Sequence, residues 1–338
     1  MAGKYLLKRA ALVFHTGLMT SDYYRFPRPP YRGKGWLIDL IPLPEEHTIG
    51  FEHANGRIYK AKEIVVRADN EMKAQRAADL IHAVRLLLQG SSCLSHVWPS
   101  EHAPVYQATK TLATAPESDF LKHALVLTRD IPLACLVACR ASFRLQAIYA
   151  LAKLRLSFDT YSVPFIELDP HHSENIPKSP FPEDHVVLAF AILAAWSCIE
   201  ELGFDIRASQ NKPSKLPNGD WNPVVRVELE ERLKKSHINL LEPFHWNLRG
   251  ARTKIEKKKA PHFVEKAPWA KYHVRDGSME VIDAIHYVSF LRSWVAAHKT
   301  EKSLLRVLSV YDVANAQFLA RRLLLEKMGF WRYWGALS

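Results

Sequence analysis

The sequence predicts an α+β protein in which a small mixed α/β domain, residues 1–115, precedes a mainly α-helical domain, residues 116–338. Short apolar segments with the alternation of strands occur only before residue 68. From residue 116 onward the apolar positions recur with the helical period instead. Residues 91–115 show neither period and are rich in Ser, Thr, His and Pro, which is typical of a linker.

Four strands and one helix are expected in the first domain. The strands are predicted at 5–15, 36–42, 48–53 and 57–67. Asn55-Gly56 favours a hairpin turn between the last two strands. Asn70 is a suitable N-cap for a helix that ends near Gln89, before Gly90. The Pro- and Arg-rich piece 26–32 is expected to be a loop.

The second domain is expected to contain six helices. They are predicted at about 117–128, 132–156, 182–203, 223–236, 279–299 and 310–328, with an irregular basic tract over 237–277. Val186–Trp196 is too short to cross a bilayer and predicts a buried central helix. Ser309 and Asp312 have the spacing of a capping box, and Gly329 ends the last helix.

Composition limits the classes of function. The net charge of +11 and the sequence pI near 9.4 predict attraction to polyanions, with nucleic acid as the first candidate. Four cysteines in 338 residues do not form a disulfide framework, and no signal peptide is recognisable, so a cytoplasmic protein is expected. Motifs of common NTPases, dinucleotide enzymes, zinc proteases and serine hydrolases are absent from the sequence, and neither a metal nor a cofactor is expected.

The most informative motif lies near the end of the chain. Arg292 and Ser293 are followed by His298, late in a predicted helix. The Arg-(x4–6)-His spacing occurs four times in the chain, and only this copy has a polar residue after the arginine, a late position in the helical array and a single helix downstream. The pair also suits a helix C-terminus, where the dipole favours cations without any catalytic role.

This motif resembles the signature of the HEPN superfamily, whose name stands for higher eukaryotes and prokaryotes nucleotide-binding. A helical array with an acidic residue late in a central helix, here Glu200 or Glu201, is also similar to that superfamily. The resemblance covers about 120–330, apart from 205–278, and implies metal-independent RNA cleavage with His298 as general acid or base. Arg292 would clamp the phosphate, Ser293 would add a hydrogen bond, and Glu200 or Glu201 would orient Arg292.

The residue types suit this chemistry because RNA carries its own nucleophile, the ribose 2′-OH. Histidine can move a proton near neutral pH, and arginine remains charged and matches phosphate oxygens with a planar fork. An offset of six residues places Arg292 and His298 about 120° apart around an ideal helix. The resemblance implies a homodimer that joins two motifs, which would relieve this mismatch.

A second basic feature lies in the tract 237–277. It contributes the candidate RNA-binding residues Arg249, Arg252, Lys254, Lys257, Lys258 and Lys259, with the aromatic residue Trp246 beside them. Cations interleaved with aromatic rings can follow a phosphate backbone and stack on bases. The alternative is a solvated basic loop whose tryptophans pack into the core.

The leading functional hypothesis is therefore a metal-independent endoribonuclease behind an N-terminal sensor or docking domain. By analogy with the superfamily it would be toxin-like or serve in antiviral defence. The expected partners are RNA, a second copy of the chain and a protein or phage-derived trigger, with no membrane. The alternatives are a catalytically inactive helical module that binds RNA or protein, and an interaction protein whose charge is incidental.

Overall fold

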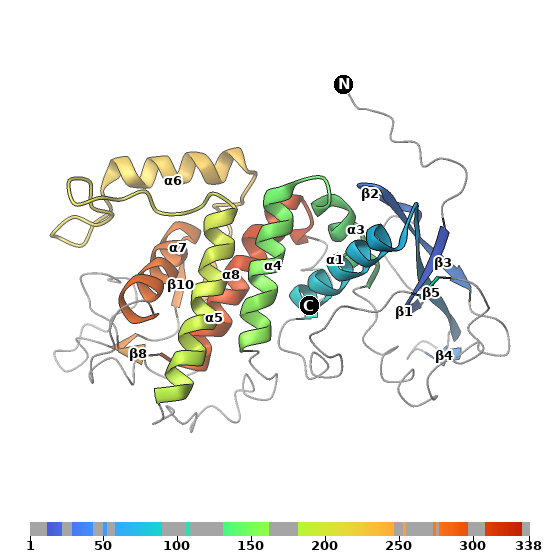
Figure 1. Ribbon diagram of the computed structural model, residues 1–338. Coiled ribbons are helices and arrows are strands. Elements are labelled where there is room, and N and C mark those ends of the chain that lie inside the picture. The colour runs from blue at the N-terminus through green and yellow to red at the C-terminus, as the bar shows by residue number, and fades with distance from the viewer. Residues whose placement is uncertain are drawn as a thin grey trace. The chain divides into compact units, whose positions relative to one another are not determined.

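The computed structural model in Figure 1 describes residues 12–21, 29–42, 50–52, 58–89, 106–107, 131–161, 182–246, 253–254, 273–274, 277–296 and 308–332. The chain divides into two compact units. The first contains Met1–Gln89, Pro99–Ile148 and Tyr333–Ser338, and the second contains Gly90–Trp98 and Tyr149–Arg332. The predicted domain boundary after residue 115 lies outside the described residues.

The first unit contains an antiparallel sheet. Its strands are β1 (Leu12–Ser21), β2 (Tyr31–Gly33), β3 (Trp36–Pro42), β4 (Gly50–Glu52), β5 (Ile58–Ala68) and β6 (Tyr106–Gln107). The order is β2-β3-β5-β1-β6, and β4 pairs with β5. Val66 of β5 lies between Ile38 of β3 and Phe14 of β1, all of them buried. The predicted strands at 36–42 and 57–67 are therefore confirmed with small shifts.

Two predictions for this sheet placed the boundaries of an element at the wrong residues. The first strand is described from Leu12 and continues to Ser21, six residues beyond the predicted end at His15, with an irregular register between His15 and Met19. The predicted loop 26–32 gives way to β2 at Tyr31, which pairs with Ile38. Pairing with β3 makes this segment a strand, although its local composition is that of a loop.

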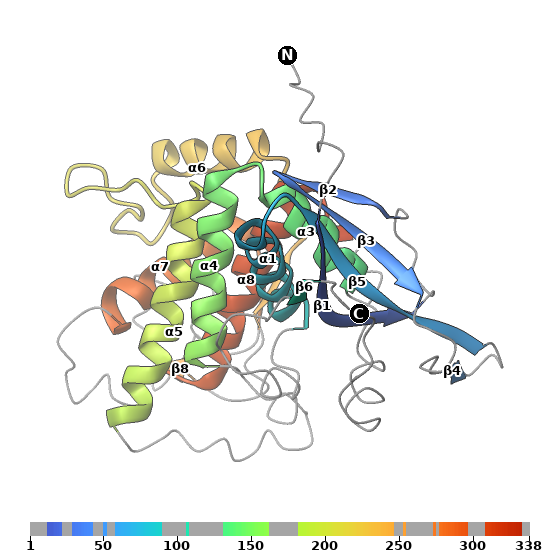
Figure 2. The same cartoon turned by 45° about the vertical axis from the view of Figure 1, so that its right-hand side comes forward.

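Helices α1 (Glu71–Gln89) and α3 (Ile131–Ala141) lie on the same face of the sheet (Figure 2). Small side chains allow α1 to approach its neighbours closely, since Ala74, Ala77 and Ala78 are fully buried. Asn70 caps α1 as predicted, because its Oδ1 accepts a hydrogen bond from Lys73 N at 3.0 Å. Cys135 and Cys139 are buried in α3, as expected of core residues.

The single helix predicted at 132–156 is in fact two helices, α3 and α4 (Leu145–Thr160), and this prediction was wrong. The break lies at Ser142, whose hydroxyl donates to the carbonyl oxygen of Cys139 at 2.7 Å and accepts from Lys34 N at 2.8 Å. The second of these hydrogen bonds ties Ser142 to the hairpin between β2 and β3. A helical period continues through the break, so periodicity alone could not reveal it.

The second unit is mainly helical. Besides α4 from Tyr149 onward, it contains α5 (Pro182–Glu201), α6 (Pro223–Lys235), α7 (Val281–Phe290), a π-helical turn η7 (Leu291–Ala296) and α8 (Val310–Met328). Helix α5 packs against α8 and η7 (Figure 1). Ser157 of α4 donates to the carbonyl oxygen of Ala191 in α5 and receives a hydrogen bond from Gln317 of α8. Three helices are thereby joined at one buried point.

Three of the predicted helix caps in this unit are confirmed. Asn222 caps α6 by accepting from Val224 N at 3.1 Å, and Ser309 and Asp312 form the capping box of α8. Gly329 ends α8 with φ of 82°, a left-handed conformation that glycine adopts readily. None of the described helices combines the length and the apolar character that crossing a membrane requires.

The tract predicted to be irregular contains short strands. These are β7 (Phe244–Trp246), β8 (Thr253–Lys254) and β9 (His273–Val274). A fourth strand, β10 (Gly277–Met279), begins at the last residue of the tract and reaches the predicted helix start at 279. β7 pairs with β10, and β8 pairs with β9, both antiparallel. The first of these pairs leads directly into α7, and the predicted site residues Arg292 and Ser293 lie in the turn η7 that follows.

Candidate functional site

The predicted site lies where helix α7 changes its geometry. Residues Val281–Val288 are all buried, so the first two turns of α7 run through the core. At Leu291 the helix widens into the π-turn η7. After these buried turns, Arg292 and Ser293 are the first two consecutive residues whose side chains are partly exposed. Single π-turns within α-helices occur frequently at functional sites.

Arg292 meets an acidic residue from the end of α5. Its Nη2 lies 3.8 Å from Glu200 Oε1, and its Nη1 lies 3.5 Å from Ser293 Oγ. The side chains of Arg292 and Glu200 are 42% and 38% exposed. Both contacts are long for hydrogen bonds to a guanidinium, so much of the planar fork faces solvent. The structure thus brings together Arg292, Ser293 and one of the two candidate acids.

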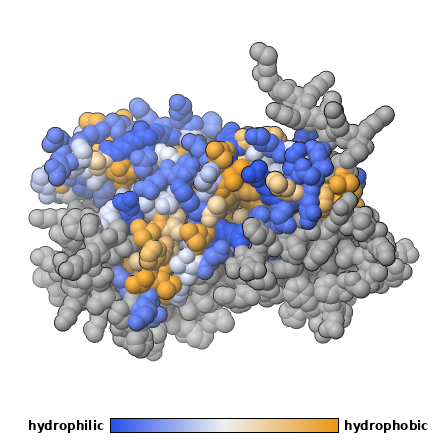
Figure 3. Space-filling view, in the orientation of Figure 1, coloured by the Kyte–Doolittle hydropathy of each residue, from blue (hydrophilic) through white to orange (hydrophobic). Residues whose placement is uncertain are grey.

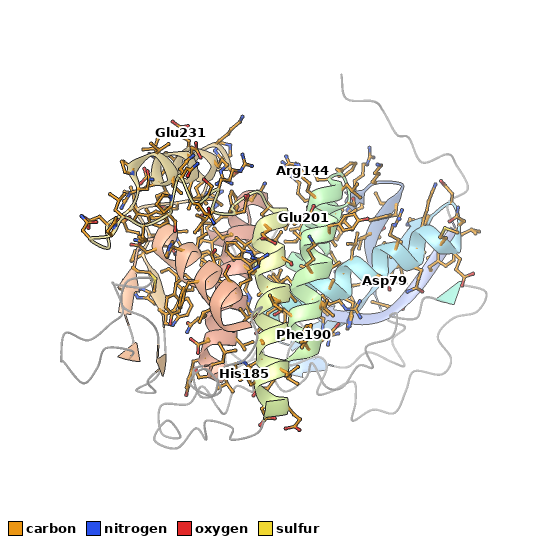
Figure 4. The ribbon with its side chains drawn as sticks, turned by 60° about the vertical axis from the view of Figure 1, so that its left-hand side comes forward. Asp79, Arg144, His185, Phe190, Glu201 and Glu231 are labelled. Atoms are coloured by element: carbon orange, nitrogen blue, oxygen red, sulfur yellow. The ribbon has the colours of Figure 1, made fainter. Side chains whose placement is uncertain are left out.

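The neighbouring acid, Glu201, has a different partner. Glu201 Oε2 accepts a hydrogen bond from Lys153 Nζ of α4 at 2.7 Å. Figure 4 shows Glu201 at the end of α5 where this helix runs beside α4. Adjacent residues on a helix face about 100° apart, so the two carboxylates are directed to separate helices. Of the two acids, only Glu200 is placed to orient Arg292.

Other arginines of this unit are held far more tightly than Arg292. Arg322 is buried, and it donates to Glu326 Oε1 at 2.8 Å and to the carbonyl oxygens of Asn239, Glu242 and Pro243. Arg232 donates to Asp205 Oδ1 at 3.0 Å and to the carbonyl oxygen of Gly203 at 2.6 Å. These guanidinium groups stabilise loops, whereas that of Arg292 keeps donors available for a ligand.

Several candidate residues lie outside the described part of the chain. These are His298, Arg249, Arg252 and the run Lys257, Lys258 and Lys259. Only the backbone of Lys254 is described, in strand β8. Trp246 is described and is buried, with its ring 4.2 Å from that of Tyr287 in an edge-on arrangement. A base could not stack on Trp246 in this position, which agrees with the alternative that this tryptophan packs into the core.

Sequence reasoning missed a buried polar cluster on α7. Asp283 accepts a hydrogen bond from Trp221 Nε1 at 2.6 Å, and its Oδ1 also lies 3.5 Å from Lys215 Nζ. Lys215 Nζ lies 4.3 Å from the centre of the Trp221 ring. His286 Nε2 lies 3.1 Å from Ser214 Oγ. The cluster joins the loop that precedes α6 to the core of the bundle.

The Lys215 side chain is held in an unfavourable environment for a cation. It is 7% exposed, and its Nζ forms the ion pair with Asp283 without hydrogen-bond geometry. Loss of hydration lowers the pKa of Lys215, and the charge of Asp283 opposes that shift. Two ionisable residues at i and i+3 in a largely apolar helix could have pointed to Asp283 and His286. Nothing local marks Lys215, because only folding brings the loop to α7.

Among the residues that the structure describes, no group of three or more His, Cys, Asp or Glu side chains is placed to hold a metal ion. The adjacent residues His171 and His172, whose side chains are of a type that binds metals, lie outside that part of the chain. No family model, curated protein or solved structure matches the chain.

Proposed function

We propose that the protein is a metal-independent endoribonuclease whose second unit is a HEPN-like helical domain centred on Arg292. The contact that carries this proposal is the one between Arg292 and Glu200. The two residues are far apart in sequence, and the resemblance anticipates an acid late in a central helix beside the motif arginine. The half-exposed guanidinium can bind an anionic phosphate while Glu200 limits its movement.

In the proposed reaction, the ribose 2′-oxygen attacks the adjacent phosphorus and the bond from phosphorus to the 5′-oxygen breaks. His298 accepts the proton of the 2′-OH or supplies one to the leaving 5′-oxygen. Arg292 stabilises the negative charge that accumulates on the phosphate oxygens, assisted by the Ser293 hydroxyl. The products are an RNA end with a 2′,3′-cyclic phosphate and an RNA end with a 5′-OH.

The proposal includes a homodimer of this chain. Leu156 of α4 and Val186, Val187 and Phe190 of α5 are exposed. The hydrogen bond between Ser157 and Ala191 brings these parts of the two helices together, and Figure 3 shows hydrophobic side chains gathered on this face of the second unit. A second copy of the chain would cover this apolar surface. Phe190→Glu is then expected to shift the mass measured by sedimentation from dimer to monomer.

The test of the reaction is cleavage of total RNA in EDTA by wild type, Arg292→Ala and His298→Ala, with analysis of the product ends. Cleavage by wild type alone, with cyclic phosphate ends, is expected. Equal cleavage by all three proteins would reject this site. RNA binding without cleavage by any of them would favour the alternative of a helical RNA-binding module.

A further inference from the structure

One corner of the first unit combines exposed cations with an exposed aromatic ring. It consists of Arg32 and Lys34 in the β2–β3 hairpin, and Arg140, Phe143 and Arg144 at the end of α3 and in the turn before α4. We call these five residues the hairpin corner. Phe143 is 52% exposed, and the four cations are exposed as well. We propose that the hairpin corner is a docking surface for single-stranded RNA.

The backbone of the hairpin corner is held in place. Lys34 N donates to Ser142 Oγ at 2.8 Å, which joins the tip of the hairpin to the turn before α4. The tip requires two glycines. A side chain at Gly33 would collide with the Trp36 ring, since a Cβ atom there would overlap Nε1, and Gly35 has φ of 88°. A fixed backbone reduces the entropy lost when a ligand binds.

The charges of the hairpin corner are available to a polyanion. Within the described residues, none of its four cations forms an ion pair with a carboxylate, whereas Arg67 contacts Asp39 at 3.5 Å. Lys73, whose side chain lies next to Gly35 at the edge of this surface, is paired with Asp69 at 2.6 Å. Figure 4 shows Arg144 at the turn before α4. Several closely placed cations can follow successive phosphates.

The aromatic ring distinguishes a nucleic acid from other polyanions. Phe143 lies in sequence between Arg140 and Arg144, and the neighbouring side chain of Leu145 is 70% exposed. An exposed ring offers a face on which an unpaired base can stack, and this contact does not depend on base identity. A duplex keeps its bases stacked on one another, so the ring favours a single strand. The choice of RNA rather than DNA as the ligand rests on the proposed function.

The experiment measures the affinity of the full chain for a fluorescent single-stranded RNA by anisotropy over a series of salt concentrations. Lys34→Ala/Arg140→Ala/Arg144→Ala is expected to reduce the slope of log affinity against log salt by about 2, since three phosphate contacts are lost. Phe143→Leu is expected to weaken binding roughly 5- to 150-fold, and Phe143→Tyr to retain it. The matched control is Arg207→Ala/Lys234→Ala/Lys235→Ala, which removes the same charge from the second unit and should leave the slope unchanged.

The outcomes separate this surface from the proposed reaction. If the hairpin-corner triple variant and Phe143→Leu bind RNA as wild type does, the docking surface is rejected, whatever the cleavage result. An equal loss in the control triple variant would also reject it, because binding would then follow net charge alone. Failure of the wild type to bind any single-stranded RNA would overturn it as well. Binding that depends on the hairpin corner, without cleavage, would support this surface and reject the endoribonuclease. Circular dichroism melts check that each variant is folded.

Discussion

The segment 281–296 carries two ion pairs in opposite surroundings. Near its start, Asp283 faces Lys215 with side chains that are 8% and 7% exposed, whereas nine residues later Arg292 faces Glu200 with both side chains more than a third exposed. Removing one partner from a buried pair leaves an uncompensated charge in the core, but an exposed pair contributes little to stability. The pair of Asp283 and Lys215 therefore contributes to the stability of the fold, whereas Arg292 of the exposed pair is accessible to a ligand.

The largest expected effect is on folding, at the buried pair. Asp283→Ala leaves Lys215 without its counter-charge and removes the acceptor of the Trp221 N–H, so we expect the free energy of unfolding to fall by about 3–5 kcal/mol. Urea unfolding followed by circular dichroism measures this change. The double variant Lys215→Met/Asp283→Leu should recover part of the loss. A change below about 1 kcal/mol in Asp283→Ala would show that the two pairs do not differ.

The next effect is on activity, at the exposed pair. Arg292→Ala should lower kcat for RNA cleavage about 100- to 1,000-fold, as expected for loss of a group that stabilises transition-state charge. Its free energy of unfolding should change by less than about 1 kcal/mol, because the ion pair is solvated. Cleavage rates and urea unfolding of the same preparation test both parts. A loss of stability as large as that of Asp283→Ala would show that Arg292 has a structural role instead.

A smaller effect on activity is expected at the two neighbouring acids. Glu200→Gln should reduce kcat/KM about tenfold, which corresponds to about 1.4 kcal/mol, because Arg292 would lose the charge that orients it. Glu201→Gln is the matched control: it weakens the contact with Lys153 and should leave cleavage within about twofold of wild type. Equal effects of the two substitutions on kcat/KM would mean that Glu200 has no particular role.

The smallest expected effect is a dependence on pH. Burial lowers the pKa of Lys215 below its usual value of 10.5, so the folded protein releases this proton at a lower pH than the unfolded chain does. Between these two pKa values the unfolded state binds more protons, and the contribution of Lys215 to stability rises with pH. Wild type should therefore gain stability relative to Lys215→Met as the pH increases toward 10.5. A constant difference in urea unfolding across that range would show that the pKa of Lys215 is not lowered.

The local parts of the fold were predictable from the sequence. The N-cap at Asn70, the capping box of Ser309 and Asp312, and the left-handed Gly329 each depend on a few neighbouring residues. The break at Ser142 was not predictable, because its hydrogen bond with Lys34 joins segments 108 residues apart. β2 was missed for the same reason, since a partner strand defines it.

The candidate site was also predictable only in part. The sequence suggested Arg292 and two adjacent acids, and only the packing of α5 against η7 distinguishes Glu200 from Glu201. Lys215 and Trp221 lie on a loop with no regular period, so their meeting with Asp283 depends on tertiary structure. Whether His298 completes the site stays a prediction that the cleavage assay tests.

The π-turn at Leu291–Ala296 changes the helical register between the core residues of α7 and the residues of the site. A π-turn closes its hydrogen bonds at i+5 instead of i+4, so it holds one residue more than an α-turn. Val281–Phe290 can thus keep their packing while Arg292 and the other residues of the turn are rotated relative to a continuous α-helix. Deleting Leu291 would realign Arg292 and Ser293 with an α-helical register, but it would also remove one fully buried side chain from the core.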